Sequence, residues 1–489
     1  MAANQRPKFN PEPCGSSSNA FDGWTPLITC AANFPIEVFE IAISQLVHHP
    51  EYNSTLILRS DVIADTTAEF SKSLPVFEGL QAVRCIHRKL LPRRPGRDPS
   101  LEQYCTLYTS SDTIDTLVLT PIVKAGSSLP YYHPTVLHLA FRYLKSDPPM
   151  LQIDVVPLSG TPLDLNSRLY RTCLALLETL HRYGWGAVTN YKKRVNHDCL
   201  VPRDEYQDLY LIMRERHKHL VDTWKEVTDP LKHVFEDIGI ATYLMLFWKI
   251  TFSARSIDND LAEPWKAWPR PPGGFLDIGC GNGLLTHILV TEGYAGYGID
   301  LRARTSWMHY PESTQAALQV HAFDPTAETL GPAAERYFQR GVFIIGNHAD
   351  ELTPWVPVLS TLHKASGYIS IPCCSWAFDI KFERSSTPAF QIPHADFAET
   401  LNLGGEGSNK SSYSMYRIWL ASLSLHCGWE VECETLRIPS TRNWAIIGRR
   451  HLESTPEAEA LENVRAIIGD VKSRALFKTR TPEGKAGDH

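Results

Sequence analysis

The 489-residue sequence lacks a long apolar run, a cysteine framework and a strong net charge. Its longest apolar stretch, residues 238–248, is interrupted by Thr242 and followed by Lys249. Such a stretch is too short to span a membrane and is typical of a buried helix. The N-terminus has no apolar segment of the kind that a secretory signal requires. We therefore expect a cytoplasmic protein that has no membrane partner.

Cysteine is sparse, with 11 residues, an odd number. This count is too low for a disulfide scaffold. The adjacent Cys373 and Cys374 have no Cys-x-x-Cys or His-x-x-x-His pair beside them, so we expect small residues buried near a substrate pocket and no metal site. The net charge of −6 excludes a general binder of polyanions, and nucleic-acid binding would need local basic patches.

Composition and periodicity divide the chain into five segments. Asp164 is expected to cap a helix over residues 165–183, and Asp229 followed by Pro230 predicts a helix over residues 231–248. The proline-rich residues 263–274 are expected to form a stiff connector at a domain boundary. The segments are disordered residues 1–20, an N-terminal α+β region at 21–162, a helical region at 163–262, an α/β domain at 263–452, and a charged helix with a polar tail at 453–489. In the second segment, β-type runs occupy residues 54–59, 116–120, 135–143 and 151–157.

Strand and helix patterns alternate in the α/β domain. The first five strands are separated by segments long enough for crossover helices, which predicts a parallel sheet. The last two are separated only by residues 437–443 and indicate an antiparallel hairpin at the edge. The seven expected strands are residues 274–278, 296–299, 318–322, 342–346, 367–372, 429–436 and 444–448. The sequence thus predicts an α/β fold with a Rossmann-like class I methyltransferase domain, built on a seven-stranded mixed sheet, at its C-terminal side. A helical region and an N-terminal α+β region precede it.

The string FLDIGCGNGLLTHIL, residues 275–289, is typical of a strand, a glycine loop and a helix. One residue separates Gly281 from Gly283, whereas the dinucleotide fingerprint needs two. Asp277 suits a ligand with an ammonium group, and Asp300 follows 23 residues later, close to the ~20-residue spacing of a ribose-binding acid. These features favour S-adenosylmethionine over a nicotinamide cofactor, and a tight structural turn is the alternative. The predicted cofactor-binding residues are Asp277, Gly279, Gly281, Asn282, Gly283, Asp300, Asp324 and Asn347.

Polar residues follow the third and fourth strands, at the edge where α/β sheets bind ligands. Asp324 could accept a hydrogen bond from an adenine amino group or could close a turn before Pro325. His348 and Asp350 are the predicted catalytic residues, because either could remove or orient the proton of a methyl-accepting hydroxyl. The alternative is that Asn347 or Asp350 caps a helix.

Basic residues gather in two clusters that lack intervening acids. One lies within residues 84–97, and the other is Lys192, Lys193 and Arg194, preceded by aromatic residues. Positive charge beside aromatic rings is typical of phosphate contacts and base stacking, and solvated loops are the alternative. Arg417, before the sixth strand, could contact a substrate phosphate or be a solvated side chain.

Five segments together resemble the tRNA (uracil-2′-O)-methyltransferases that modify uridine at tRNA position 44. They are residues 275–307, the strings GNHADELTPWVP, IPCCSW and LRIPSTRNWAIIG, and the helical stretch at 191–244. The resemblance covers roughly residues 165–450. It implies a cytoplasmic enzyme that uses S-adenosylmethionine to methylate the ribose 2′-hydroxyl of a uridine in serine tRNAs, with tRNA and not DNA as its partner.

The Lys–Asp–Lys–Glu tetrad of many ribose methyltransferases is not recognisable in this sequence, so the general base is left open. Two other functions fit the residues. One is a methyltransferase that acts on a protein or a small molecule. The other is a non-catalytic RNA-binding protein with a methyltransferase-like fold.

Overall fold

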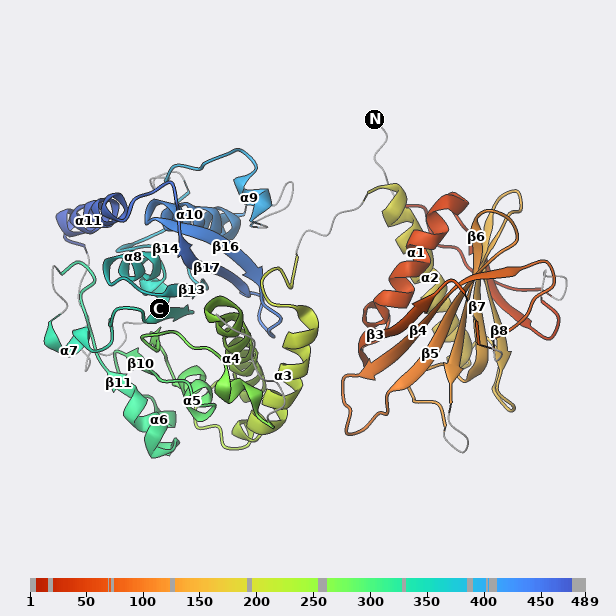
Figure 1. Ribbon diagram of the computed structural model, residues 1–489, viewed down its shortest axis with the longest axis horizontal. Helices are drawn as coiled ribbons and strands as arrows, with labels where there is room; N and C mark the ends of the chain where they lie inside the picture. The colour runs from red at the N-terminus through yellow and green to blue at the C-terminus, as the bar shows by residue number, and fades with distance from the viewer. Residues whose placement is uncertain are drawn as a thin grey trace. The chain divides into compact units, whose positions relative to one another are not determined.

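The computed structural model describes residues 6–15, 21–68, 70–71, 74–123, 128–190, 196–253, 262–327, 331–384, 390–401, 403 and 411–476. The chain forms two compact units, Met1–Lys192 and Lys193–His489, which Figure 1 colours from red to yellow and from yellow to blue. This division differs from the boundary predicted near residue 163, because the long helix that follows residue 163 packs within the first unit.

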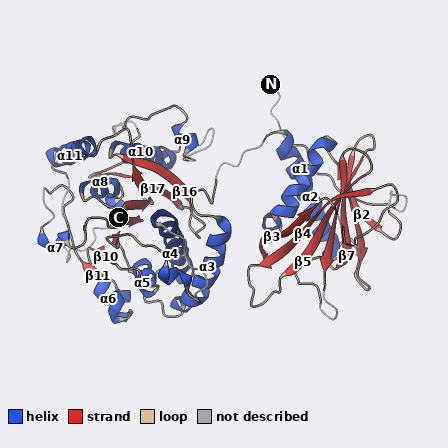
Figure 2. Ribbon diagram, in the orientation of Figure 1, coloured by secondary structure: helices blue, strands red, loops and turns tan. Residues whose placement is uncertain are grey.

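The first unit is built on an eight-stranded antiparallel sheet with the order β1-β2-β8-β7-β6-β5-β4-β3 (Figure 2). Its interior strands bury most of their side chains. The strands are β1 (Glu12–Pro13), β2 (Thr25–Ala31), β3 (Ile57–Thr66), β4 (Gln81–Pro92), β5 (Leu101–Thr109), β6 (Ile114–Ile122), β7 (Val136–Leu144) and β8 (Met150–Pro157).

Two helices share the core of this sheet, α1 (Phe39–His48) and α2 (Arg168–Val188). In α2, Leu169, Cys173, Leu177 and Leu180 recur at helical spacing and are buried against the strands. The spacing predicted this helix, but the predicted starting residue was wrong. Ser167, and not Asp164, caps the helix by accepting a hydrogen bond from the amide of Tyr170.

Several N-terminal elements were not predicted, namely α1, β2, β4 and β5. Disorder over residues 1–20 was also expected, yet Glu12 and Pro13 pair with Ile28 and Thr29 of β2. This pairing supplies backbone hydrogen bonds that composition alone does not reveal. Residues 1–5 and 16–20 lie outside the described part of the chain.

The second unit is built on a seven-stranded mixed sheet with the order β11-β10-β9-β12-β13-β17-β16. The first five strands in this order are parallel, whereas β17 is antiparallel to both β13 and β16. Each of the seven predicted strand segments overlaps one of these strands. They are β9 (Phe275–Ile278), β10 (Gly296–Asp300), β11 (Leu318–Val320), β12 (Phe343–Asn347), β13 (Gly367–Ile371), β16 (Trp429–Thr435) and β17 (Trp444–His451).

Helix α4 (Pro230–Phe252) forms much of the core of this unit. It begins as predicted, with Asp229 accepting a hydrogen bond from the amide of Leu231 and Pro230 at the first helical position. Residues 238–248 are all buried, as a helix that is apolar on every side must be. The other helices are α3 (Arg203–His217), α5 (Leu284–Thr291), α6 (Glu312–Ala317), α7 (Pro332–Glu335), α8 (Trp355–Leu362), α9 (Phe397–Thr400), α10 (Ser412–His426) and α11 (Glu457–Arg474). A small ribbon of β14 (Trp376–Ala377) and β15 (Ile380–Lys381) completes the unit.

The proline-rich residues 263–274 are not a domain boundary, contrary to the prediction. Trp265 is buried, and its indole Nε1 donates a hydrogen bond to Glu292 Oε2 at 2.7 Å. The segment therefore packs inside the second unit.

The carboxylate of Glu434 holds residues near the start of the second unit. Glu434, at the end of β16, accepts hydrogen bonds from the amides of Cys199 and Leu200 at 2.8 and 2.9 Å. His197 Nδ1 lies 2.6 Å from the carbonyl oxygen of Thr435. Residues 197–200 are thus attached to the edge of the sheet.

No helix in the described part of the chain is long and apolar enough to cross a membrane.

Candidate active site

The glycine loop, residues 279–283, joins β9 to α5. Gly279, Gly281 and Gly283 have φ values of 70°, 56° and 75°, a region that glycine enters without strain. A Cβ atom on Gly283 would lie 2.7 Å from the side chain of Leu318, whereas one on Gly281 would meet no heavy atom within 4 Å. Gly283 is thus required by packing, whereas the space beside the α-carbon of Gly281 is empty of protein atoms.

Two acids hold this loop, Asp277 and Asp300. Asp277 is 1 % exposed; its Oδ2 accepts a hydrogen bond from Thr286 Oγ1 at 3.1 Å, and its Oδ1 has no partner among the described residues. Burial, together with the charge of Asp300, raises the pKa of Asp277 to about 7. Asp300 Oδ2 accepts a hydrogen bond from the amide of Gly281 at 2.8 Å. The site therefore holds a buried carboxylate that a cation would stabilise.

Asn282 and Asp324 both make local hydrogen bonds. Asn282 Oδ1 accepts from the amide of Leu284 at 3.0 Å, at the start of α5. Asp324 Oδ1 accepts from the amide and the hydroxyl of Thr326 at 2.8 and 2.6 Å. These contacts are those of the turn that was the alternative for Asp324. The predicted contacts of both residues with the cofactor stay predictions.

The loop after β12 contains two residues in the left-handed region, His348 with φ of 52° and Asp350 with φ of 45°. Residues other than glycine rarely adopt this conformation, and it is concentrated at functional sites. His348 Nε2 lies 3.1 Å from Glu236 Oε1 of α4. Burial of Glu236 opposes ionisation, but the hydrogen bond and charge of His348 outweigh it and lower the pKa of Glu236. His348 and Glu236 are 112 residues apart in the chain, so their pairing depends on the packing of α4 against this loop.

Asp237 of α4 also lies at this site, where it receives a 3.4 Å hydrogen bond from Asn347 Nδ2. Burial, followed by the charges of Glu236 and Asp277, raises the pKa of Asp237 well above its usual range. Sequence reasoning missed both α4 acids. The sequence does contain a feature that could have identified them, because Glu236 and Asp237 are adjacent acids immediately before the longest apolar run of the chain.

Asp350 lies beside the two adjacent cysteines that follow β13. The thiol Sγ of Cys373 is 3.3 Å from Asp350 Oδ1. Cys373 is half-buried and Cys374 is exposed, so the prediction that both are buried small residues is wrong for Cys374. The cysteines follow the end of a strand, and the loop turns them toward Asp350 and away from the core.

Arg417 of α10 is 5 % exposed and is not the solvated side chain that was considered. Its guanidinium lies 3.8 Å from the ring centre of Trp444 and 5.0 Å from that of Tyr413. Nη2 donates to Ser414 Oγ at 3.1 Å, whereas Nε and Nη1 have no partner among the described residues. The predicted contact of Arg417 with RNA stays a prediction.

The first basic cluster contains both bound and exposed side chains, and Arg93, Arg94 and Arg97 are the exposed ones. Arg84 is paired with Asp65, with Nε and Oδ1 2.9 Å apart, and Arg88 is buried and donates to Gln103 Oε1 at 3.0 Å. The cluster of Lys192, Lys193 and Arg194 lies outside the described residues.

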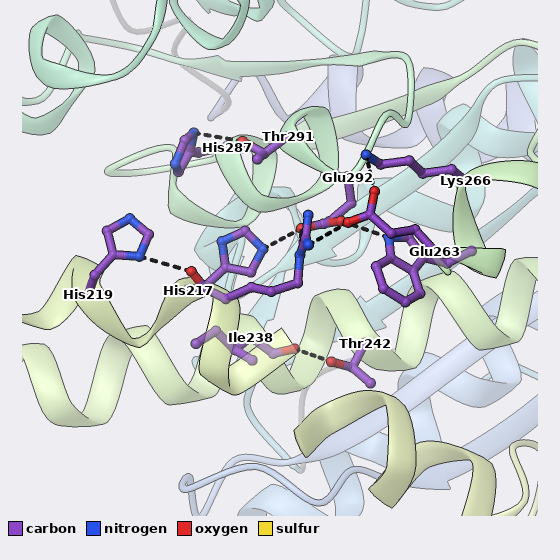
Figure 3. A network of polar contacts seen from close by, with 11 residues as sticks. His217, His219, Ile238, Thr242, Glu263, Lys266, His287, Thr291 and Glu292 are labelled. Carbon is purple, nitrogen blue, oxygen red and sulfur yellow. Dashed lines mark hydrogen bonds and ion pairs between the residues drawn. The ribbon is translucent and has the colours of Figure 1, made fainter. Parts of the chain in front are cut away.

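A polar network at the C-terminal end of α5 is centred on Glu292 (Figure 3). Glu292, which is fully buried, accepts hydrogen bonds from Arg216 Nε at 2.9 Å and Trp265 Nε1 at 2.7 Å, and its Oε1 lies 2.7 Å from His217 Nε2. Burial alone would raise the pKa of Glu292, but the hydrogen bonds from His217, Arg216 and Trp265 lower it to about 2. The network joins α3, α5 and the segment around Trp265.

Comparison with known proteins gives consistent matches for both units. The family model described as "TRM44-like, N-terminal bet v1-like domain" matches residues 4–194, and the model described as "Predicted AdoMet-dependent methyltransferase" matches residues 200–325. No solved structure matches the chain significantly.

Several curated proteins match nearly the whole chain, and each of them is called tRNA (uracil-O(2)-)-methyltransferase. The protein of Schizosaccharomyces pombe is 36% identical over 463 residues, covering 88% of this chain and 86% of its own length. The protein of Neurospora crassa is 33% identical, with 91% and 92% covered. That of Candida glabrata is 32% identical, with 87% and 88% covered.

Proposed function

The chain belongs to the family of the tRNA (uracil-O(2)-)-methyltransferases, and from this membership we propose that it transfers a methyl group from S-adenosylmethionine to the ribose 2′-hydroxyl of a uridine in tRNA. The finer assignments to uridine 44, to serine tRNAs and to the cytoplasm come from the resemblance of its motifs. We also assign the second unit to the Rossmann-like class I methyltransferases, supported by its strand order and its terminal hairpin.

The observation that carries this proposal is the glycine loop between two acids. Its residues fit S-adenosylmethionine, because the space beside the α-carbon of Gly281 is empty of protein atoms and Asp277 Oδ1 is a buried carboxylate oxygen without a partner in the described residues. Asp277 would hold the ammonium group, and Asp300 the ribose hydroxyls. The cofactor supplies a methyl group made electrophilic by its sulfonium. An acid with a raised pKa is stabilised in its charged form by such a cation.

His348 is our candidate for the general base. Glu236 faces Nε2 of the imidazole, and a hydrogen bond from this nitrogen leaves Nδ1 as the proton acceptor. Nδ1 has no partner among the described residues. Nδ1 is also buried, so a ring held by a carboxylate on its other nitrogen would accept the proton of a ribose hydroxyl that enters this buried position. Asp350 is placed two residues further on and would position the acceptor.

Binding of the tRNA itself is proposed to involve Lys192, Lys193, Arg194 and Arg417. The matched N-terminal unit is proposed to help hold the RNA. These assignments rest on residue type and on family membership.

One experiment tests the proposed function against its rivals. The purified chain is incubated with methyl-labelled S-adenosylmethionine and total tRNA, and labelled nucleosides are mapped. We expect 2′-O-methyluridine at one site in serine tRNAs. Label in protein or in a small molecule would favour a different methyltransferase, and tRNA binding without label would favour a non-catalytic RNA-binding protein. The Asp277→Ala variant is the control, because it should lose cofactor binding measured by calorimetry.

A further inference from the structure

The carboxyl ends of β12 and β13 bring together three side chains that metal ions bind. The ligand atoms of Asp350, Cys373 and Cys374 all lie within 4.8 Å of one another. Among the residues that the structure describes, no other group of three His, Cys, Asp or Glu side chains has this spacing. The sequence predicted no metal site here, because Asp350 is 23 residues from Cys373 and the pair of cysteines is not a known ligand motif.

The spacing agrees with a tetrahedral zinc site. Zinc binds thiolate sulfur at about 2.3 Å and carboxylate oxygen at about 2.0–2.2 Å, so a tetrahedral ion places a sulfur and an oxygen ligand roughly 3.5 Å apart. Cys373 Sγ and Asp350 Oδ1 are 3.3 Å apart. The ligand atoms are therefore close to their required separation without a change of the backbone.

Main-chain contacts hold the two loops that carry these ligands. The amide of His348 donates to the carbonyl of Ile371 at 3.1 Å, which fixes the loop of Asp350 against the end of β13. Tyr413 donates its hydroxyl to the carbonyl of Pro372 at 2.8 Å, directly before the cysteines. The ligands are thus held on two tied loops at the edge of a rigid sheet, as a site of defined geometry requires.

The chemistry of the ligands selects the metal. Two thiolates favour zinc over magnesium or calcium, which prefer oxygen ligands. Three protein ligands are the number found in catalytic zinc sites, where the fourth position binds water or substrate. Asp350 and Cys374 are exposed, so the fourth position can be reached from outside.

We propose that Asp350, Cys373 and Cys374 bind a zinc ion whose fourth position is open beside His348. Metal binding does not depend on the proposed function, but the role in the reaction rests on it. A ribose hydroxyl at the fourth position would have its acidity increased. His348 would take the proton of this hydroxyl as the oxygen forms a bond to the methyl carbon, and the carbon–sulfur bond of the cofactor would break to release a neutral sulfide.

The first test measures zinc itself. The full chain is loaded with zinc sulfate, passed through a desalting column and analysed for metal. About one zinc per chain is expected, and fewer than about 0.1 in the Cys373→Ser/Cys374→Ser double variant. The matched control is Cys199→Ser, which removes another exposed thiol and should keep the full amount. Equal zinc in the double variant and the wild-type chain, or none in either, overturns the proposal.

The second test identifies the ligands by spectroscopy. Cobalt(II) replaces zinc in such sites, and thiolate ligands then produce a charge-transfer band in the near ultraviolet. We expect this band in the wild-type chain and in Cys199→Ser, and no band in the double variant. In Asp350→Asn the affinity for cobalt should be lower. Circular dichroism checks that each variant is folded. A band that survives in the double variant would place the metal elsewhere and refute the assignment.

The two proposals can fail separately. Calorimetry with S-adenosylmethionine and the labelled-tRNA assay test the function, whereas zinc content and the cobalt band test the metal site. A chain that binds zinc but methylates no uridine keeps the site and loses the function. A chain that methylates tRNA without zinc keeps the function and loses the site.

Discussion

His348 Nε2 and Glu236 Oε1 lie 3.1 Å apart, although 112 residues separate them in the chain. The contact joins the loop at the end of β12 to helix α4. It supplies the carboxylate that a catalytic imidazole needs for a fixed orientation.

Substitution of the predicted base should separate catalysis from cofactor binding. We expect His348→Ala to lower kcat by about 10²- to 10⁴-fold, the range for loss of a general base, and to leave the affinity for S-adenosylmethionine unchanged. Single-turnover methylation of tRNA and calorimetry measure the two quantities.

Substitution of Glu236, the partner of His348, should also lower kcat, but by a smaller factor. Glu236→Gln keeps the size of the side chain but removes the charge that orients the ring, and we expect kcat to fall by about 10- to 100-fold. The control is Glu459→Gln on the exposed face of α11, which should leave kcat unchanged. Equal kcat values for both variants would mean that Glu236 does not act through His348.

The raised pKa of Asp277 predicts that cofactor affinity and stability depend on pH in opposite ways. Because the pKa is about 7 in the folded chain, higher than in the unfolded chain, folding favours the protonated form. The contribution of Asp277 to the stability of the cofactor-free chain is therefore most favourable below its unfolded pKa and is lost as pH rises through 7. Affinity for a cationic cofactor should rise over the same interval, because binding needs the carboxylate.

The Asp277→Asn variant is the control for this dependence. Its free energy of unfolding, measured by urea titration between pH 5 and 8, should lack the fall that the wild-type chain shows. The expected wild-type fall is of the order of 1–4 kcal/mol. If the two chains have parallel profiles, Asp277 is not the titrating group.

Glu292 should contribute strongly to the stability of the second unit. Because the carboxylate is fully buried and has three hydrogen-bonding neighbours, we expect Glu292→Gln to lower the free energy of unfolding by about 2–4 kcal/mol. Its pKa of about 2 lies below the unfolded value, so this stabilisation is present above pH 5 and is lost as pH falls toward 2.

Glu215→Gln provides the comparison for Glu292. Glu215 pairs with Lys218 on the exposed side of the same region, and exposed ion pairs contribute little to stability. Its urea midpoint should match that of the wild-type chain. A similar loss in both variants would contradict the assigned role of Glu292.

Gly283→Ala should destabilise the glycine loop. The residue has a positive φ, and an added Cβ would lie 2.7 Å from Leu318, so we expect a loss of at least about 1–2 kcal/mol together with weaker cofactor binding. Gly469→Ala on α11, where a Cβ meets nothing within 4 Å, should instead stabilise the helix by up to about 1 kcal/mol. Thermal unfolding of both variants tests this contrast.

The sequence was most informative where local chemistry sets the structure. The glycine loop, the cap at Asp229 and the strands of the second unit were predicted because glycine spacing, capping residues and apolar runs act within a few residues. Strands β4 and β5 were missed because polar residues such as Arg88 and Gln103 interrupt their apolar pattern, and these side chains bond to each other inside the fold.

The site was only partly predictable for a similar reason. His348 and Asp350 were predicted as site residues from their place after a strand, but the positions of Glu236 and Asp237 and the approach of Cys373 to Asp350 depend on contacts between distant segments. No spacing rule covers a pair of residues that meets only after α4 and β12 have packed.

The attachment of residues 197–200 to Glu434 has a practical consequence. A shortened polypeptide that begins at Asn196 would keep the amides of Cys199 and Leu200, which donate hydrogen bonds to Glu434. The second unit would therefore keep the contacts that hold its first residues. We expect that the two units can be produced as separate polypeptides. Adding one to the other in a reaction would reveal which half selects the RNA and which performs the chemistry.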